Sequence, residues 1–439
     1  MWTCDFDLGF HAASVKTILE KSASDAVVLV DPSAALVDAK IIDNCIENAR
    51  NHENAELTFT QAAPGLAGAL LRPILVDRLI QASTHPGRLL HYLPDQPVRD
   101  PIGSEGCVPV PAAISRTTHN FRFDSQRQID RFSRASANLN GQLISSNAEE
   151  LMNRLNWSTD VDPLPREIVM EVNTIRSTSP IFWPGKHQPI ERPAMSIATA
   201  KNILSQIAVA DDVRLTLNGI GDPLLHDDIF EIINFAKSAG IRAIHVETDL
   251  LPRNPATIER LVDSEIDVVS VHLPAMTPQT YAAIMGADCF GQVVENIRRF
   301  ITRRQQRKSG VPILVPVFVK CQLNLAEMEN WYDQWLKALG AAVINGPSEF
   351  SGLIQNCGVA DMSPPKRRAC ARLWSRMTIL CDGKVVACEQ DVTGKQIIGD
   401  VCEKSISDIW RNQFDELRTS HKRGCAAGIC GGCREWHRP

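Results

Sequence analysis

The sequence predicts an α/β protein: a partial (β/α)6 barrel with an N-terminal α/β domain and a small cysteine-rich C-terminal domain. Three observations support this. Six apolar runs alternate with amphipathic stretches between residues 167 and 346, a weaker alternation precedes them, and cysteines crowd the region that follows. At about 100–200 residues per domain, 439 residues leave room for three domains. We expect them at residues 1–160, 167–346 and 362–439.

The composition and the first residues of the chain exclude several classes of protein. The chain is 44% hydrophobic and 22% charged, as in ordinary globular proteins, and its net charge of −5 gives no basis for binding a nucleic-acid backbone. Residues 1–7 hold neither the basic nor the apolar segment of a signal peptide. No apolar run approaches the ~18 residues that span a bilayer. We therefore expect a cytoplasmic protein with no nucleic-acid partner and no membrane contact.

The N-terminal region alternates less regularly than the rest. Apolar runs predict strands at residues 26–30 and 57–61. Amphipathic patterns predict helices at residues 41–50, 66–79 (interrupted by Pro73), 126–137 and 147–155. Asp and Pro cluster at residues 158–166, where we expect a linker.

The middle of the chain has a clearer rhythm. Runs typical of buried strands lie at residues 168–172, 213–217, 243–246, 268–273, 313–319 and 341–344. Helix-like stretches lie at residues 197–207, 227–238, 255–263, 277–284, 291–304 and 326–339. This alternation indicates a parallel sheet with right-handed crossovers, and six units fit a partial barrel better than a closed one. Functional groups are expected at the C-terminal ends of its strands.

Cysteine usage distinguishes the C-terminal region. Seven of the 13 cysteines lie between Cys370 and Cys433. In a reducing cytosol such a cluster more often binds metal or acts in catalysis than forms disulfides. Asp-Gly at residues 382–383, between two β-prone runs, predicts a hairpin. The hairpin lies between Cys370 and Cys388, and a CxxC that begins at Cys430 follows.

Four of these thiols are candidates for one metal centre. Thiolates placed on a hairpin and on a CxxC fit either a tetrahedral zinc ion or an iron–sulfur cluster. The candidates are Cys370, Cys388, Cys430 and Cys433. The alternative is a set of buried free cysteines, because cysteine packs as a small hydrophobe. Three thiols are left over, and we expect at least two of them to be ordinary buried thiols: Cys381, Cys402 and Cys425.

Residues 370–433 also resemble a known domain. The hairpin with its Gly383-x4-Cys388 element, the run at residues 407–410 and the final CxxC look like the SPASM/twitch domain. That domain follows radical SAM barrels and holds auxiliary [4Fe-4S] clusters. The resemblance implies one auxiliary [4Fe-4S] cluster on the four candidate cysteines, and the middle region then resembles the radical SAM partial barrel.

A loop of the predicted barrel resembles the second-strand motif of radical SAM proteins, usually two glycines and a Glu followed by Pro-Leu-Leu. The matching run is at residues 215–226, where Gly219, Gly221 and Asp222 hold the motif positions. The resemblance implies that these residues bind the amino group of S-adenosylmethionine, which glycine lets the backbone approach. Asp222 stands in place of the usual Glu.

The cysteines that make such a barrel catalytic are missing. In the family, the first strand is followed by C-x3-C-x2-C, which holds the cluster that cleaves S-adenosylmethionine reductively. Arg176, Pro180 and Trp183 occupy the corresponding positions, and no cysteine lies between Cys107 and Cys289. None of the three side chains can replace a thiolate on iron. We therefore expect the radical chemistry to be absent.

The N-terminal region resembles part of a nucleotidyltransferase or glycosyltransferase-like domain. Residues 27–38 look like a strand that ends at a metal-binding acid, here Asp31, and residues 63–68 are similar to a following segment. The glycine-rich nucleotide loop of such domains has no counterpart, so we expect a truncated domain. The alternative for Asp31 is a plain strand-ending turn with Pro32.

Three hypotheses follow. In the first, the chain binds one auxiliary [4Fe-4S] cluster, has lost radical cleavage, and serves in binding or electron transfer. In the second, it is an enzyme that still binds S-adenosylmethionine and modifies a peptide or sugar. In the third, zinc stabilises an interaction module. No catalytic residue is assigned; His245, Glu247 and His272 either line the barrel interior or are satisfied core residues.

Overall fold

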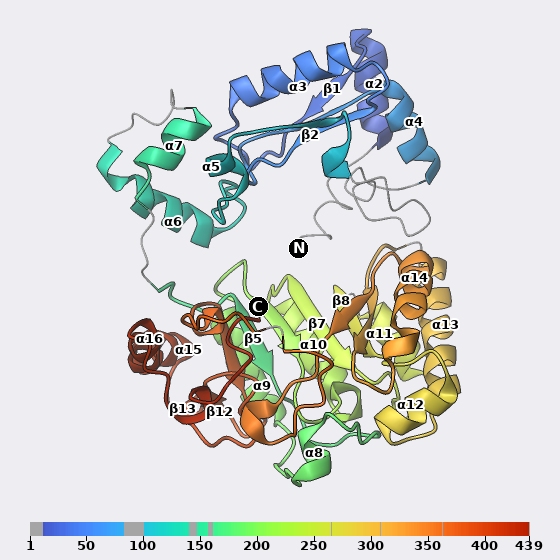
Figure 1. Ribbon diagram of the computed structural model, residues 1–439, viewed down its shortest axis with the longest axis vertical. Helices are drawn as coiled ribbons and strands as arrows, with labels where there is room; N and C mark the ends of the chain where they lie inside the picture. The colour runs from blue at the N-terminus through green and yellow to red at the C-terminus, as the bar shows by residue number, and fades with distance from the viewer. Residues whose placement is uncertain are drawn as a thin grey trace. The chain divides into compact units, whose positions relative to one another are not determined.

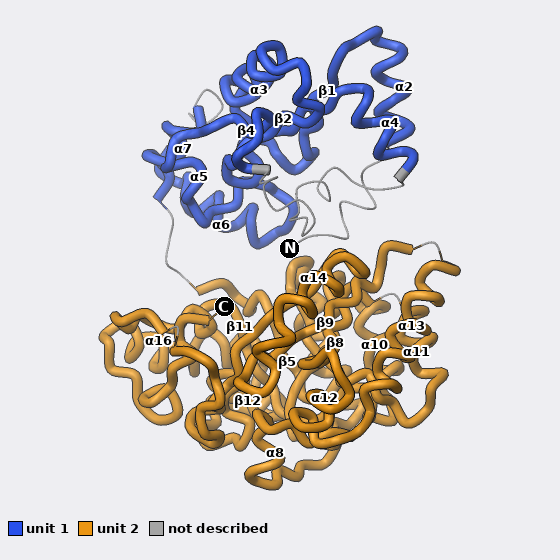
Figure 2. The backbone as a smooth tube through the Cα atoms, turned by 45° about the vertical axis from the view of Figure 1, so that its right-hand side comes forward, with its two compact units in different colours: residues 1–160 blue, residues 161–439 orange. Residues whose placement is uncertain are grey.

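The computed structural model describes residues 12–82, 101–139, 147–156, 161–264, 266–307, 309–361 and 363–438. The chain forms two compact units, residues 1–160 and 161–439 (Figure 2). Both of the later expected regions lie in the second unit. Residues 1–7 and 158–160, which carry the signal-peptide prediction and part of the predicted linker, lie outside the described residues. Within the described ranges, no helix is long and apolar enough to cross a membrane.

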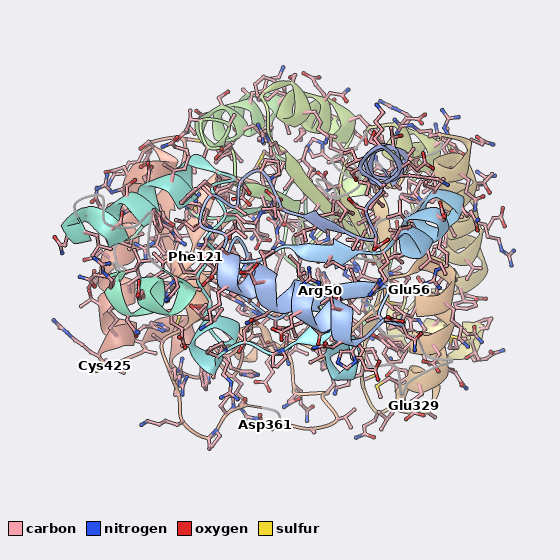
Figure 3. The ribbon with its side chains drawn as sticks, turned by 90° about the horizontal axis from the view of Figure 1, so that it is seen from above. Arg50, Glu56, Phe121, Glu329, Asp361 and Cys425 are labelled. Atoms are coloured by element: carbon pink, nitrogen blue, oxygen red, sulfur yellow. The ribbon has the colours of Figure 1, made fainter. Side chains whose placement is uncertain are left out.

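The first unit contains a four-stranded sheet in the order β1-β3-β2-β4. β3 pairs antiparallel with β1 and β2, and β2 pairs in parallel with β4. The strands are β1 (Val27–Leu29), β2 (Leu57–Thr60), β3 (Ala69–Leu71) and β4 (Cys107–Val108). The helices are α2 (Ala12–Ser22), α3 (Ala39–Asn51), α4 (Pro73–Ala82), α5 (Ala112–Ser115), α6 (Gln126–Ser136) and α7 (Ala148–Arg154). Phe121, labelled in Figure 3, is fully buried in one of this unit's apolar clusters.

One predicted helix of the first unit is wrong in its first half. Instead of a helix over residues 66–79, Ala69–Leu71 forms β3 and α4 begins at Pro73. Proline suits the first turn of a helix, where its missing N–H needs no partner, and it biases the preceding residue towards extended conformations. Pro73 therefore starts the helix rather than interrupting it.

Asp31 is held by the turn that follows β1. Its carboxylate accepts a hydrogen bond from the Ser33 backbone N–H at 2.8 Å and pairs with Arg122 at 2.8 Å. A carboxylate that bonds the backbone two residues on is the usual device of an Asx turn. These contacts are the ones that the turn interpretation of Asp31 expects.

The second unit is built on one open nine-stranded sheet, ordered β10-β9-β8-β7-β6-β5-β11-β12-β13 (Figure 1). The six strands from β5 to β10 are parallel, as predicted. β11 joins β5 in parallel, and β12 and β13 continue the sheet antiparallel. The predicted hairpin therefore extends the barrel sheet at its β5 edge instead of forming a separate layer.

The observed strands match the predicted runs within a few residues. They are β5 (Glu167–Met170), β6 (Arg214–Leu217), β7 (Ala243–Thr248), β8 (Val268–His272), β9 (Ile313–Val319), β10 (Val343–Asn345), β11 (Arg376–Ile379), β12 (Lys384–Val386) and β13 (Ile397–Asp400). The crossover helices are α8 (Pro184–His187), α9 (Ile197–Ile207), α10 (Ile229–Ser238), α11 (Thr257–Asp263), α12 (Pro278–Met285), α13 (Phe290–Gln306) and α14 (Met328–Leu339). The C-terminal helix, predicted near residues 407–417, runs as α15 (Ile406–Asp408), a π-helical turn (Ile409–Gln413) and α16 (Phe414–Lys422).

The outer face of the parallel sheet carries the main apolar core. Outward side chains such as Ile168, Leu215 and Val269 are fully buried among residues of the crossover helices. α9 begins at the predicted residue because Ser196 caps it, accepting a hydrogen bond from the Thr199 backbone N–H at 3.0 Å. With the outer face given to packing, the inner face is free to carry polar groups.

Candidate functional site

The inner face of this sheet lines a cavity of about 600 Å³. Successive side chains of a strand point to opposite faces, so every second residue reaches the cavity. The strand register places inward side chains of neighbouring strands side by side. They form three layers, which we call the base, middle and upper layers, from the N-terminal to the C-terminal ends of the parallel strands.

The base layer is a closed network of paired charges. Arg376, Glu167 and Arg214 are in register on β11, β5 and β6. Glu167 lies 2.6 Å from Arg214 and 2.9 Å from Arg376, and Arg376 also contacts Glu389 at 2.8 Å. Burial acts to raise the pKa of Glu167, but the charges of Arg376 and Arg214 outweigh it and the pKa lies below its ordinary value. Arg372 also lies 3.1 Å from Glu389, so each charge at the base has a partner of opposite sign, with three arginines sharing two glutamates.

The middle layer carries hydroxyl groups and an imidazole. Thr378, Val169, Thr216 and His245 are in register across four strands. His245 Nε2 lies 2.8 Å from the Ser270 hydroxyl on the next strand. The buried Thr378 hydroxyl has no hydrogen-bond partner among the described residues, an arrangement that costs free energy unless something else satisfies it. The middle layer is therefore polar, and one of its buried hydroxyl groups has no hydrogen-bond partner in the described part of the protein.

The His245 imidazole makes the stability of the fold depend on pH. Burial, helped by the Arg214 charge, lowers the pKa of His245, so the folded state holds it neutral. Its contribution to stability is lost as pH falls from the unfolded value of about 6.5 towards the lower folded pKa, because only the unfolded chain then takes up the proton. We expect the Tm to fall between about pH 7.5 and pH 5.5, and to fall less in a His245→Gln variant. Equal falls in both proteins would contradict this.

The upper layer consists of the residues that directly follow the last paired residues of β5, β6 and β7, which are Met170, Leu217 and Val246. Glu171, Asn218 and Glu247 reach the cavity here. Glu171 pairs with Arg192 at 2.7 Å, and this arginine also donates to the Val392 carbonyl at 2.9 Å. Glu247 has no arginine or lysine partner in the described part of the chain; its nearest basic atom is His245 Nδ1, at 3.9 Å. The neutral imidazole leaves the Glu247 charge uncompensated.

A buried charged cluster around Arg176 caps the C-terminal end of the cavity. Arg176 makes two hydrogen bonds to Asp249, one of them at 2.8 Å, and approaches His272 Nδ1 at 3.2 Å. Its guanidinium stacks over the Trp183 ring at 4.1 Å, and the Trp183 N–H donates to the Ile220 carbonyl at 2.7 Å. The Arg176 and Asp249 side chains are 7% and 0% exposed. Two of the three positions expected for cluster ligands therefore meet in a stacked pair.

The pKa values of two buried acids next to this cap are shifted in opposite directions. Burial acts to raise the pKa of Asp249, but Arg176 and hydrogen bonds from His272 and Thr178 hold it far below its ordinary range. Burial and the neighbouring Asp249 charge raise the pKa of Asp222. The Arg176 charge is thus matched by Asp249, while Asp222 tends towards its neutral form.

The two glycines of the motif lie where neighbouring atoms leave no room for a side chain. Gly219 lines the cavity, whereas Gly221 and Asp222 are not among its lining residues. A β-carbon at Gly219 would lie 2.5 Å from Glu171 Cγ, and one at Gly221 would collide with Asn173. The Asp222 carboxylate accepts hydrogen bonds from the Leu224 and Asp249 backbone N–H groups and from Thr248. That these three residues bind S-adenosylmethionine stays a prediction.

The four candidate cysteines come from separate segments of the C-terminal region. Cys370 precedes a 3-10 turn (Ala371–Trp374), Cys388 follows β12, and Cys430 ends another 3-10 turn (Gly428–Cys430). Burial, with the charges of Cys433 and Cys370, raises the pKa of Cys430 to about 11. Cys430 likewise raises the pKa of Cys388, after burial and Glu389. The four thiols thus lie close enough to interact electrostatically.

Neighbouring groups hold these thiols in place. Arg367 donates to the Gly431 and Cys430 carbonyls, the first at 3.0 Å. The Glu435 backbone N–H donates to Cys433 Sγ at 3.3 Å. Within the described residues, no group of three or more His, Cys, Asp or Glu side chains is arranged to hold a single metal ion. The donor set, four thiols and no carboxylate, suits a [4Fe-4S] cluster and also suits a tetrahedral zinc ion.

The remaining cysteines differ from the prediction. Cys381 is buried, and burial together with Glu171 raises its pKa to about 12. Cys402 and Cys425 are exposed, so the prediction that at least two of the three are buried was wrong; Cys425 is labelled in Figure 3. Both lie in the turns that follow β13 and α16, where the chain reaches the surface.

Sequence reasoning found only part of the cavity lining. His245, Glu247 and His272 line the cavity, as one of the two alternatives stated. The sequence analysis missed Ser270, Thr216 and Thr378. Each is a polar residue in an otherwise apolar strand, at an alternating position that faces the cavity, and this pattern could have identified them. The Arg176–Asp249 pair, 73 residues apart in the sequence, has no local signal.

Comparison with known proteins identifies the C-terminal part of the chain. Residues 370–434 match the family model of SPASM, described as an iron-sulfur cluster-binding domain, and so form a SPASM domain. An uncharacterized protein of Treponema pallidum is 30% identical over 125 residues, which cover 28% of this chain and 34% of that protein. A probable GTP 3',8-cyclase of Sulfurisphaera tokodaii is 24% identical over 129 residues, 29% of this chain and 39% of that protein. The chain spans 34% to 49% of the length of the curated relatives it matches.

The fold has a counterpart among solved structures. The crystal structure of Streptococcus suis SuiB bound to precursor peptide SuiA matches with a TM-score of 0.51 at 12% sequence identity. The match covers 87% of this chain and 94% of that one. At this identity the likeness shows the fold alone.

Proposed function

We propose that this chain of radical SAM/SPASM architecture binds one auxiliary [4Fe-4S] cluster through four C-terminal cysteines and does not cleave S-adenosylmethionine reductively. The ligands would be Cys370, Cys388, Cys430 and Cys433. The barrel then acts as a binding scaffold, and the cluster as a structural or electron-transfer element. The observation that carries the proposal is the Arg176–Trp183 stack at the positions expected for barrel cluster ligands.

The stacked pair is chemically unable to hold iron. Arginine remains protonated and offers no lone pair, and the tryptophan ring nitrogen is only a donor. Both groups already have partners, since Asp249 neutralises Arg176 and the Ile220 carbonyl accepts from Trp183. Pro180, at the remaining ligand position, is buried and has no ligating atom in its side chain. These contacts support a barrel that is stable without a cluster at this place.

The C-terminal thiols have the opposite character. They are four in number, electrostatically coupled, and carried on turns that backbone and arginine contacts hold. A β-carbon at Gly432, inside the CxxC, would meet nothing within 4 Å, so the turn is not filled by its own packing. An iron–sulfur cluster bound by four thiolates would supply one-electron redox chemistry there. This asymmetry between the two sites favours a protein that keeps the auxiliary cluster alone.

Counting iron and sulfide after anaerobic reconstitution tests the proposal. We expect about four irons and four sulfides per chain, as in one [4Fe-4S] cluster, with absorption that extends into the visible. A Cys430→Ala variant should lose most of both, because it lacks one ligand. Cys425→Ala removes an exposed cysteine outside the ligand set and should keep them.

Two results would overturn this part of the proposal. Zinc in place of iron in protein purified without oxygen would assign the thiols to a structural zinc site. Iron that persists in the Cys430→Ala variant would place the cluster on other ligands.

A second candidate is an enzyme that still binds S-adenosylmethionine and modifies a peptide or sugar. The observation in its favour is that Gly219, of the predicted binding motif, lines the cavity. Against it, the Asp222 carboxylate is already occupied by Thr248 and by two backbone N–H groups. Calorimetric titration separates the candidates: saturable heat with S-adenosylmethionine at millimolar concentration favours the enzyme, and its absence removes this candidate.

A further inference from the structure

The charges that line the cavity do not cancel. Five arginines line it, and each pairs with an acid of the same unit: Arg176 with Asp249, Arg214 and Arg376 with Glu167, Arg372 with Glu389, and Arg438 with Glu435. Two further lining acids also have partners. Glu171 forms an ion pair with Arg192, and Asp391 accepts hydrogen bonds from two backbone N–H groups. Glu247 and Asp391 have no cationic partner among the described lining residues, and of these two only Glu247 also lacks backbone N–H donors. In the described part of the chain, the Glu247 carboxylate is therefore the lining acid with neither kind of partner.

Hydrogen-bonding groups line the same cavity as this carboxylate. Ser270 is in register with Glu247 on the adjacent strand, and its hydroxyl contacts His245 at 2.8 Å. Asn218 presents its amide from the upper layer. Thr378, 4% exposed, lines the cavity from β11, three strands along the sheet from β7, and its hydroxyl has no partner among the described residues. A buried polar group without a partner is rare in native proteins and calls for an explanation, which a bound ligand would provide.

We propose that the cavity binds a small polyhydroxylated molecule that carries a protonated amine. Glu247 pairs with the ammonium group, while Ser270, Asn218 and Thr378 bond the hydroxyl groups. The inference rests on the proposed function in one respect: it gives the barrel the ligand that a binding scaffold requires. The volume of about 600 Å³ lies within the range of small-molecule sites.

The same observations disfavour other ligand classes. A phosphate or carboxylate beside Glu247 would meet a like charge, and no arginine or lysine pairs with Glu247 among the described residues. A purely apolar ligand would leave Glu247 uncompensated and Thr378 unbonded, at the cost of both desolvation penalties. A neutral polyol would satisfy the hydroxyls but not the charge. An amino polyol satisfies both.

Calorimetric titration of the reconstituted full chain with three probes tests the proposal. The probes are glucosamine, which has both features, glucose, which lacks the amine, and cyclohexylamine, which lacks the hydroxyls. We expect glucosamine to bind about 10- to 100-fold more tightly than either of the others, the range expected for a hydrogen bond to a charged group. Glu247→Gln should remove its advantage over glucose. Thr378→Val should weaken glucosamine and glucose alike.

Matched controls separate binding from folding and from the proposed function. Glu295→Gln, on the exposed face of α13, removes the same charge and should leave the titration unchanged. Iron content, measured on each sample, should not differ between Glu247→Gln and the parent. Iron without glucosamine binding overturns this inference alone, and binding without iron overturns the proposed function alone.

Three further results would overturn the inference. These are equal binding of glucosamine and cyclohexylamine, no heat with any probe at about 10 mM, and an unchanged titration in Glu247→Gln. S-adenosylmethionine binding that depends on Glu247 would also overturn it, by assigning this carboxylate to the second candidate function.

Discussion

An Arg176→Met variant is expected to lose about 3–5 kcal/mol of unfolding free energy, the usual cost of breaking a buried ion pair by removing one partner. The cost arises because Asp249, 0% exposed, would keep its charge without the guanidinium that neutralises it. The stacking contact with Trp183 would be lost as well. Urea unfolding followed by circular dichroism measures the change.

Two further variants make this result specific. In Arg176→Met with Asp249→Asn, the orphaned charge is gone, and we expect more than half of the loss to be recovered. Arg303 of α13 and Asp263 of α11 form an exposed pair, and Arg303→Met should cost far less than Arg176→Met. If Arg176→Met cost as little as Arg303→Met, the cap would not be the structural substitute for a cluster that we describe.

The second large effect is expected at Gly221. In a Gly221→Ala variant the new methyl group would meet the Asn173 carbonyl at 2.5 Å and the Ile175 backbone nitrogen at 2.7 Å. Backbone atoms cannot move aside as a flexible side chain can, so we expect a loss of about 3 kcal/mol, in the upper range for overpacking. Thermal unfolding of the purified variant measures it.

Gly291 provides the matched control. It lies in the first turn of α13, and a β-carbon there would meet nothing within 4 Å. Gly291→Ala should be neutral or should stabilise the protein by up to about 1 kcal/mol, because alanine is the better helix former. Equal destabilisation by both substitutions would show that the contact at Gly221 is not the cause.

Most of the fold could be predicted from the sequence because its parallel strands are long apolar runs between amphipathic helices. α9 and β9 have the predicted bounds, and the hairpin was found from Asp382 and Gly383. The pairing of β11 with β5 could not be predicted, since it joins segments about 200 residues apart with no local signal. The strand β3 was missed because a three-residue strand has too short a pattern to be recognised.

The candidate site was predicted less completely than the fold. Cysteine spacing is a local pattern, so the four thiols could be named in advance, and the missing barrel cysteines were equally visible. What replaces them was not: the contact of Arg176 with Asp249 and Trp183 depends on tertiary structure. The layers of the cavity depend on the register between neighbouring strands. The sequence alone does not determine this register here, because both faces of each strand are covered.

Electron paramagnetic resonance of the reconstituted, dithionite-reduced protein, recorded with and without S-adenosylmethionine, reports whether the chain holds only the auxiliary cluster. We expect one iron–sulfur signal that S-adenosylmethionine leaves unchanged and that Cys430→Ala abolishes. A second signal, or a signal that changes when S-adenosylmethionine is added, would show that the barrel also holds a cluster or binds S-adenosylmethionine at one.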